Sequence, residues 1–387
     1  MEIPKRFPEF SLTRLLRAVF EPRHGERIAL LIDLDEPRRM RDFSFVNDPA
    51  LPIQRTAYEV FYRGLAGGGL EELGLLGGDM FAYKITGGSN LDLPREAMDA
   101  NGRAVSLDRD IYRSYDIILC ISTFSATAPL TAFAKRFGFR GATLHGINDM
   151  ILRTGLAVDY NRVSRDTEKL RLGLTRADSI EFDFEVVHRR HSLNLILGRQ
   201  EAQKSHGLAR GKTPDIVNLP AGEVYFVPRG AEGRFPMKYE DGTIGLMEVA
   251  GGRIVNVTLI VGNREVVRQH QQRIMSDPAT GWLGELGLGT QRLPWAGRDI
   301  QDEKILGTAH IATGRNDHLG GDLTPDKFNE PSHATHDDIL FAPHKTPEIR
   351  VPEVRMCRDG KTVVLLRDYE PAEYIASLLG DLPPDAS

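Results

Sequence analysis

The chain has 387 residues, 41% hydrophobic and 27% charged, which is the balance of a folded globular protein with room for two domains. Its formal net charge of -5 argues against the basic surface that nucleic-acid binding needs. Its two cysteines, Cys120 and Cys357, stand alone in apolar runs, which argues against a disulfide framework or a thiolate zinc site.

The N-terminal sequence MEIPKRFPEF lacks the continuous apolar stretch of a signal peptide. The longest apolar runs, such as IALLI and DIILCI, are far too short to span a bilayer. We therefore expect a cytoplasmic protein with no membrane partner and no nucleic-acid partner.

The first half of the chain alternates helix-like and strand-like segments. Residues 11–20 have helical spacing, with Ser11 as the expected cap, and a second helix-like stretch ends at the glycine of KRFGF. Short apolar runs of the buried-strand type are 27–34, 116–122 and 140–146. This alternation predicts a parallel sheet covered by helices, in an N-terminal α/β domain at residues 1–157. Residues 50–110 are rich in Gly and Asp and show no clear pattern.

The second half changes character. A helix is predicted at 165–174, and strand-like segments follow at 179–198, 241–267 and 354–366. The last of them carries Asp359-Gly360 at its centre, which is a strong hairpin signal. We therefore predict an α+β catalytic domain with a mixed or antiparallel sheet at residues 158–387, in a chain of the α/β class.

The sequence has no P-loop, HExxH, GxSxG or CxxC motif. What remains is a set of acids and histidines on short segments bracketed by Gly or Pro: Glu223 in NLPAGEVYFVP, Glu285 in GWLGELGLGT, His310 in GTAHIATG, and His336 and Asp338 in SHATHDDILF. Each has an ordinary interpretation by itself. A lone histidine in a strand is more often a hydrogen-bonded core residue, a Glu beside Gly usually faces water, and His-x-Asp triplets are common by chance.

Together these residues favour a metal site. Glu223 and Glu285 lie in otherwise uncharged apolar segments, where an unpaired carboxylate would cost several kcal/mol. His310 would share a strand face with the small residue Ala312, which leaves room for an ion. Three carboxylates and two imidazoles can hold two divalent ions about 3.5–4 Å apart. Nitrogen and oxygen donors suit Zn, Mn, Co or Fe(II).

The segments LPAGEV, LGELGLGT, DEKILGTAHIATG and HDD occur in the order of metallopeptidase family M29, the thermophilic, aminopeptidase T/S-like aminopeptidases, which the chain resembles most clearly over residues 116–366. The resemblance implies an N-terminal α/β domain, a catalytic domain with two metal ions, and a homodimer that encloses the site. It implies as metal ligands Glu223, Glu285, His310, His336 and Asp338. Glu303 matches the acid of the family's Asp-Glu pair ahead of the histidine.

The function that follows is metal-dependent hydrolysis of a small peptide or small-molecule amide, with two ions of Zn, Co or Mn activating a water. Glu303 would relay a proton to the leaving amine or, equally, orient His310. The family's tyrosine seven residues after the histidine is replaced here by Asp317, followed by His318. His318 could take the tyrosine's catalytic role, and Asp317 could add a ligand.

Two alternatives stay open. The fold is also similar to that of 2,5-dihydroxypyridine 5,6-dioxygenase, a ring-cleaving Fe(II) enzyme, and His310, His336 and Asp338 could hold one iron. Glu223 and Glu285 would then be superfluous. A non-catalytic binding protein is the other alternative, and the presence of all five ligand candidates argues against it. The basic stretch 200–220 is either a solvated loop, or one of its residues Lys204, His206, Arg210 and Lys212 pairs with a substrate carboxylate.

Overall fold

The computed structural model describes residues 7–380, which divide into two compact units that interleave along the chain. The first unit runs to Ser164 and includes His206–Ala221 and Arg298–Gln301. The second comprises Arg165–Ser205, Gly222–Gly297 and the chain from Asp302 onward. The contiguous division at residue 157 stays a prediction. Within residues 7–380, no helix is long and apolar enough to cross a membrane.

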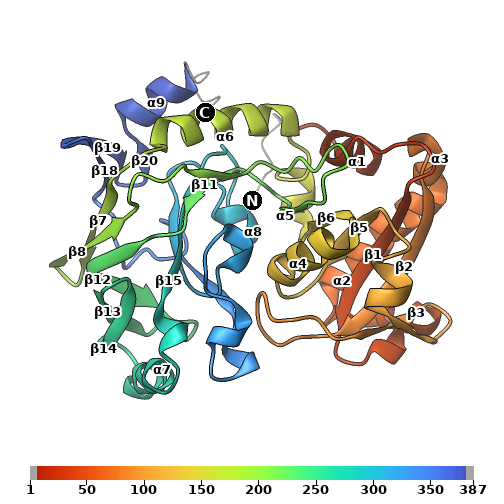
Figure 1. The fold of residues 1–387 in the computed structure, drawn as a ribbon, viewed down its shortest axis with the longest axis horizontal. Helices are drawn as coiled ribbons and strands as arrows, with labels where there is room; N and C mark the ends of the chain where they lie inside the picture. The colour runs from red at the N-terminus through yellow and green to blue at the C-terminus, as the bar shows by residue number, and fades with distance from the viewer. Residues whose placement is uncertain (1–6, 381–387) are drawn as a thin grey trace. The chain divides into compact units, whose positions relative to one another are not determined.

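The first unit is built on a seven-stranded sheet with the order β10-β6-β5-β1-β2-β3-β4 (Figure 1). Its strands are β1 (Arg27–Leu34), β2 (Leu76–Lys84), β3 (Glu96–Asp99), β4 (Ala104–Ser106), β5 (Ile117–Ile121), β6 (Arg140–Thr143) and β10 (Ile216–Asn218). The strands from β10 to β2 pair in parallel, and β3 and β4 add an antiparallel edge. β1 and β5 are almost wholly buried, as their continuous apolar sequences require. The α/β class is confirmed.

The helices of this region are α1 (Leu12–Phe20), α2 (Pro52–Thr56), α3 (Leu70–Leu73), α4 (Thr127–Phe137), α5 (Asp149–Arg153) and α6 (Tyr160–Leu174), the last of which continues into the second unit. Ser11 caps α1 as predicted, since its hydroxyl accepts from the Arg14 N–H at 3.2 Å. α4 ends at Gly138, whose φ of 91° stops the helix.

The second unit contains an eight-stranded antiparallel sheet with the order β14-β13-β12-β8-β7-β18-β19-β20. Its strands are β7 (Ser179–Val186), β8 (Arg189–Ile196), β12 (Gly230–Lys238), β13 (Ile244–Ala250), β14 (Arg253–Val261), β18 (Glu353–Arg358), β19 (Lys361–Arg367) and β20 (Glu370–Pro371). The hairpin predicted at Asp359-Gly360 joins β18 to β19. The β-rich stretch predicted to run to 267 ends earlier, because Asn263 caps the helix α7 (Arg264–Ser276). A further helix, α9 (Glu373–Leu379), follows β20.

A five-stranded sheet with the order β17-β16-β15-β11-β9 completes this unit. Its strands are β9 (Gln203–Ser205), β11 (Glu223–Phe226), β15 (Leu283–Gly289), β16 (Ala309–Gly314) and β17 (His336–Phe341), and the short helix α8 (Asp299–Asp302) lies between β15 and β16 in sequence. Its pairings are antiparallel, so the mixed sheet of the structure belongs to the first unit. Alternate residues such as Leu286, Ile311 and Phe341 join the apolar core of the second unit. The opposite face is therefore available for other side chains.

Candidate metal centre

The five ligand candidates lie on the non-core face of the five-stranded sheet. Residues directly opposite each other in an antiparallel pair share a face, and Glu285 on β15, Ala312 on β16 and Asp338 on β17 form one such row. The small side chain of Ala312 lies between the two acids, as expected for the neighbour of a metal ligand. The register of three strands thus directs two carboxylates to one place.

His310 lies in the next row, opposite Gly287 on β15. Its imidazole occupies the space above this glycine, since a Cβ at Gly287 would lie 2.1 Å from Cε1 and 2.2 Å from Nε2 of the ring. Only glycine at this position lets the ring lie flat across the neighbouring strand. The Nδ1 atom of His310 is buried and has no hydrogen-bond partner within residues 7–380.

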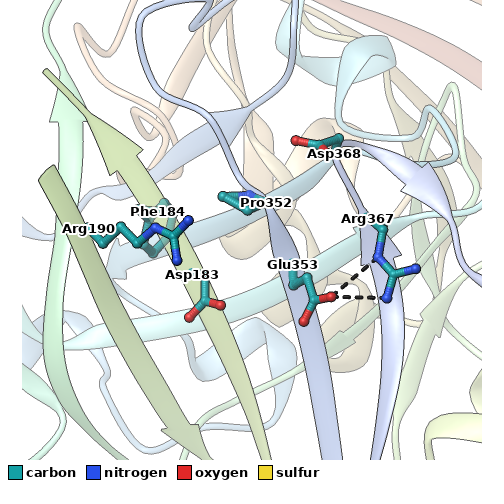
Figure 2. Close-up of a pocket in the computed structure, with 7 residues that line it drawn as sticks. All are labelled: Asp183, Phe184, Arg190, Pro352, Glu353, Arg367 and Asp368. Carbon is teal, nitrogen blue, oxygen red and sulfur yellow. Dashed lines mark hydrogen bonds and ion pairs between the residues drawn. The ribbon is translucent and has the colours of Figure 1, made fainter. Parts of the chain in front are cut away.

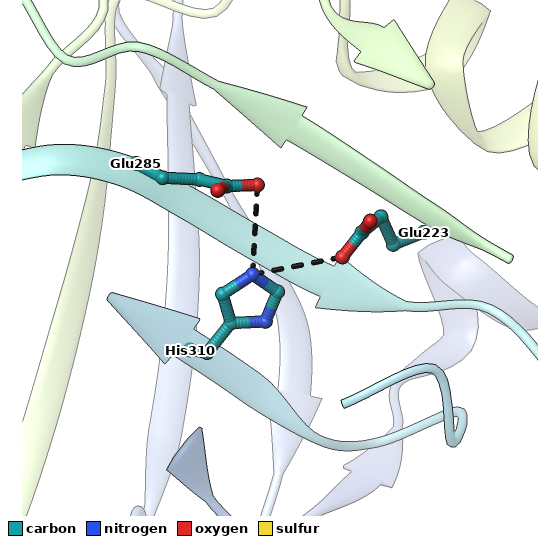
Figure 3. Close-up of side chains that lie close together, drawn as sticks. All are labelled: Glu223, Glu285 and His310. Atoms are coloured by element: carbon teal, nitrogen blue, oxygen red, sulfur yellow. Dashed lines mark ion pairs between the residues drawn. The ribbon is translucent and has the colours of Figure 1, made fainter. Parts of the chain in front are cut away.

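Glu223 begins β11 and completes the set from the other side of β15. The Nε2 atom of His310 lies 3.6 Å from Oε2 of Glu223 and 3.5 Å from Oε1 of Glu285. Figure 3 shows both carboxylates directed at the same ring nitrogen. All three side chains are buried, so the two acids face the imidazole in a place from which water is largely excluded.

His336 approaches Glu285 from β17. Its Nε2 atom lies 3.0 Å from Oε2 of Glu285 and 3.3 Å from Oδ1 of Asp338. Its Nδ1 atom lies 2.6 Å from the main-chain oxygen of Arg315, which fixes the ring and leaves Nε2 as the atom that faces the acids. This is the arrangement that orients metal-binding histidines in proteins. Asp338 keeps 30% of its side-chain surface exposed.

The donors form three overlapping groups, each with ligand atoms within 4.8 Å of one another: Glu223, Glu285 and His310; Glu285, His336 and Asp338; and Glu303, His310 and Asp338. None of the three groups contains both histidines. Glu285 belongs to two of them and presents a different oxygen to each imidazole. The donor atoms, all nitrogen and oxygen, fit a divalent ion of the Zn, Mn, Co or Fe(II) type.

The charges of this centre influence one another strongly. Although burial disfavours the charged form, the Glu285 carboxylate raises the pKa of His310 to about 9. Burial is likewise outweighed at His336, whose pKa is raised by Asp338 and Glu285. The two imidazoles in turn hold the pKa of Glu285 below its usual range, against the effect of burial. The acids therefore favour the protonated, positively charged forms of His310 and His336.

Sequence reasoning missed Lys304, whose residue is only 1% exposed. Its Nζ atom lies 2.6 Å from Oε1 of Glu223 and 2.5 Å from Oε1 of Glu303. The lysine stands in the segment DEKILG, where no local signal marks it, because adjacent charges usually face solvent. The partner that the sequence predicts for the acids is a metal ion, whereas Glu223 also has this lysine as a partner.

Glu303 itself lies beside the ligand candidates, in one donor group with His310 and Asp338. Burial raises the pKa of Glu303 to about 8, although the Lys304 ammonium acts in the opposite direction. Near neutral pH this carboxyl can therefore exist in either protonation state, as a group that moves a proton requires.

Two residues follow the histidine where the resembled family has its tyrosine. The side chain of His318 is buried, and its ring centroid lies 5.0 Å from that of His336 at an angle of 85°. Burial, reinforced by the charge of His336, lowers the pKa of His318 to about 3, so the ring is neutral at physiological pH. Asp317 instead pairs with Arg315, at 2.7 Å, and belongs to none of the three donor groups.

The basic stretch 200–220 has other contacts. Arg210 donates to the main-chain oxygen of Ala18 and to Oδ1 of Asn161, and Lys204 pairs with Glu168 at 2.8 Å. These contacts account for both cations within the fold and give no support to a role in substrate binding.

A surface pocket of about 340 Å³ lies on the eight-stranded sheet (Figure 2). It is lined by Asp183, Phe184, Arg190, Pro352, Glu353, Arg367 and Asp368. Its acids are largely neutralised by arginines, since Arg355 binds both Asp183 and Glu353, and Arg367 binds Glu353 at 3.0 Å. None of the residues singled out in the sequence lines this pocket.

Neither a comparison with protein-family models nor one with curated proteins finds a match to the chain. Among solved structures, 2,5-dihydroxypyridine dioxygenase from Pseudomonas putida KT2440 is similar, with a TM-score of 0.60 at 14% sequence identity. The match covers 94% of this chain and 98% of the dioxygenase. The predicted relationship in fold to this enzyme is thereby confirmed, and the chain shares its fold over almost the whole length.

Proposed function

We propose that the chain is a metal-dependent enzyme in which Glu223, Glu285, His310, His336 and Asp338 hold two divalent ions. The observation that carries the proposal is the position of Glu285 between the two imidazoles, with Oε1 3.5 Å from His310 and Oε2 3.0 Å from His336. A carboxylate that presents one oxygen to each of two donor groups is suited to bridge a pair of ions.

The reaction we propose is hydrolysis of an amide bond in a small peptide or related molecule, by Zn, Co or Mn. Support comes from the resemblance of LPAGEV, LGELGLGT and DEKILGTAHIATG to the M29 aminopeptidases. The bound ions would lower the pKa of a shared water and polarise the substrate carbonyl. Glu303, with its pKa near neutrality, would accept a proton and donate it to the leaving amine.

His318 is the second residue proposed to act in the reaction. It takes the place in sequence of the family's tyrosine, and its neutral ring lies beside His336. A neutral imidazole can donate a hydrogen bond through one nitrogen, as the phenol of the family's tyrosine could. The homodimer and the cytoplasmic location expected from the sequence stay predictions.

The second candidate is a non-haem Fe(II) ring-cleaving dioxygenase, in which His310, His336 and Asp338 hold one iron. The likeness in fold to 2,5-dihydroxypyridine dioxygenase favours it. So does Lys304, because this cation already compensates the charge of Glu223 and reduces the need for a second ion. One observation argues against it: none of the three donor groups contains both His310 and His336, although a single iron would need both as ligands.

Metal analysis of the protein purified without added metal tests both candidates. About two ions of Zn, Co or Mn per chain, with release of amino acids from a peptide panel, is the expected result. About one Fe per chain, with oxygen uptake on hydroxylated aromatic compounds, would replace the hydrolase by the dioxygenase. A chain that binds none of these ions at stoichiometric levels would contradict both.

A further inference from the structure

Lys304 is buried at a point where two carboxylates meet. Burying an ammonium group is expensive unless it is paired and hydrogen-bonded, and Lys304 satisfies this by contacting one oxygen of Glu223 and one of Glu303. The two acids raise its pKa despite burial, so the side chain is charged. A permanent cation thus stands next to the proposed ligands.

The main chain fixes the position of this lysine. The carbonyl oxygen of Lys304 accepts from the N–H groups of Thr290 and Gln291, at 3.0 and 2.8 Å. The segment crosses directly above Gly289, where a Cβ would lie 2.1 Å from the carbonyl oxygen of Ile305. Gly289 is also the residue opposite Glu223 in the sheet. The lysine is therefore anchored to the residues that directly follow β15, beside the acid that it binds.

The two oxygens of Glu223 have different partners. Oε1 is bound by Lys304, and Oε2 faces Nε2 of His310 at 3.6 Å. Glu303 is held in the same way through its own Oε1. With one oxygen occupied, each of these acids has a single oxygen left for an ion or a substrate proton.

We propose that Lys304 is a positioning residue of the metal centre, which limits Glu223 and Glu303 to one free oxygen each and fixes the direction of that oxygen. The inference rests on the proposed function, because it presumes that the centre binds divalent ions. It differs from a purely stabilising role, in which any buried cation would serve and the geometry at the metal would not depend on it.

Loading the protein with Co(II) in place of the native ion allows the geometry at the metal to be measured directly, since the visible absorption of Co(II) depends on its coordination number and geometry. In Lys304→Met, both oxygens of Glu223 become free, so we expect the absorption spectrum of the Co(II)-loaded protein to change. We also expect Co(II) affinity to fall by about 10–100-fold, the range found when groups that orient metal ligands are removed. An unchanged spectrum would overturn the proposal, and so would an equal or higher affinity, which is the behaviour of a simple counter-charge.

Lys204→Met is the matched control. Lys204 forms a Lys–Glu pair of 2.8 Å with Glu168 in the same unit, but neither residue belongs to a donor group. Its spectrum and Co(II) affinity should equal those of the wild type. If the wild type takes up no Co(II), the proposed function and the inference both fail. If it takes up Co(II) and Lys304→Met is indistinguishable from it, only the inference fails.

Lys304→Met leaves two buried acids without their partner, and this can prevent folding. The comparison is then made in a Glu303→Gln background, where only Glu223 loses its cationic partner. Glu303→Gln and the double variant Glu303→Gln, Lys304→Met differ in the cation at position 304 and in the restraint that it places on Glu223. The proposal requires different Co(II) spectra for this pair, and identical spectra would overturn it.

Discussion

Glu285 is the residue on which most of the centre's contacts converge, because it faces both imidazoles. In Glu285→Gln the shape is kept and the charge that attracts two cations is lost. We expect metal affinity to fall by at least about tenfold, since even loss of a residue that only supports a ligand has this effect. Activity should fall steeply with it. Titration of metal into the apo forms of wild type and variant measures the change.

Glu348→Gln provides the comparison for this experiment. Glu348 pairs with Lys238 at 2.8 Å on the surface of the same unit, with 48% of its side chain exposed. Its replacement should leave metal affinity and stoichiometry unchanged. Equal stoichiometry and equal affinity in Glu285→Gln and the wild type would remove Glu285 from the proposed ligand set.

Single residues differ in how well the sequence reveals them. Glu223 and Glu285 are conspicuous because each is an isolated charge in an apolar segment. Lys304 is not, because it belongs to the run DEK, and adjacent charges usually face solvent. Its burial depends on the close approach of residues 303–305 to Gly289, a contact between segments that local sequence does not encode.

Strand β15 supplies both a ligand candidate and the space for another. In Gly287→Ala, the new methyl group would overlap the ring of His310, so the ring or the strand must move. We expect a loss of about 1–3 kcal/mol in the free energy of unfolding, as for other overpacked sites. Metal affinity should fall as well, because the displaced imidazole no longer faces Glu223 and Glu285. Chemical denaturation and metal titration measure the two effects.

Gly230→Ala tests whether any strand glycine would behave in this way. Gly230 begins β12, and its nearest atom to an added Cβ is Ile196 Cδ1 at 3.6 Å, an ordinary contact. This variant should bind metal like the wild type and unfold with nearly the same free energy. If Gly287→Ala did the same, His310 would have to be positioned by something other than the strand beneath it.

The elements that local sequence predicts well are those with one dominant signal. β1 coincides with the apolar run 27–34, and the Asp359-Gly360 turn lies where the hairpin was expected. Residues 50–110 show no clear pattern for a physical reason. They contain short π-helical segments at Ala57–Tyr62 and Leu65–Gly69, whose spacing differs from that of an α-helix, and Gly68 interrupts the second of them with a φ of 116°.

At the scale of the whole molecule, the proposed metal should stabilise one unit selectively. A ligand at about 100 times its Kd adds about 2.7 kcal/mol to the state that binds it. We expect amide hydrogen exchange in β11, β15, β16 and β17 to slow by up to about 100-fold on metal addition, while β1 and β5 change little. Exchange measured by mass spectrometry checks this. Equal slowing in both units would contradict it.

The interleaving of the two units is harder to predict from sequence than their elements. A strand-helix alternation in one half and β-rich segments in the other indicate two kinds of architecture, and both are present. The compact units interleave along the chain, because His206–Ala221 and Arg298–Gln301 belong with the first unit. The return of a short segment is a matter of long-range packing. The composition of such a segment does not indicate to which unit it belongs.

The row of Glu285, Ala312 and Asp338 has a consequence for how the chain reaches its native state. A slip of one residue between β15 and β16, or between β16 and β17, would turn charged side chains into the apolar core and turn residues such as Leu286 and Ile311 out of it. Misaligned pairings of these strands are therefore rejected by the same acids and imidazoles that are proposed to bind metal. The acids and imidazoles of the centre thus help to fix the register of these strands, and this effect does not require a bound ion or substrate.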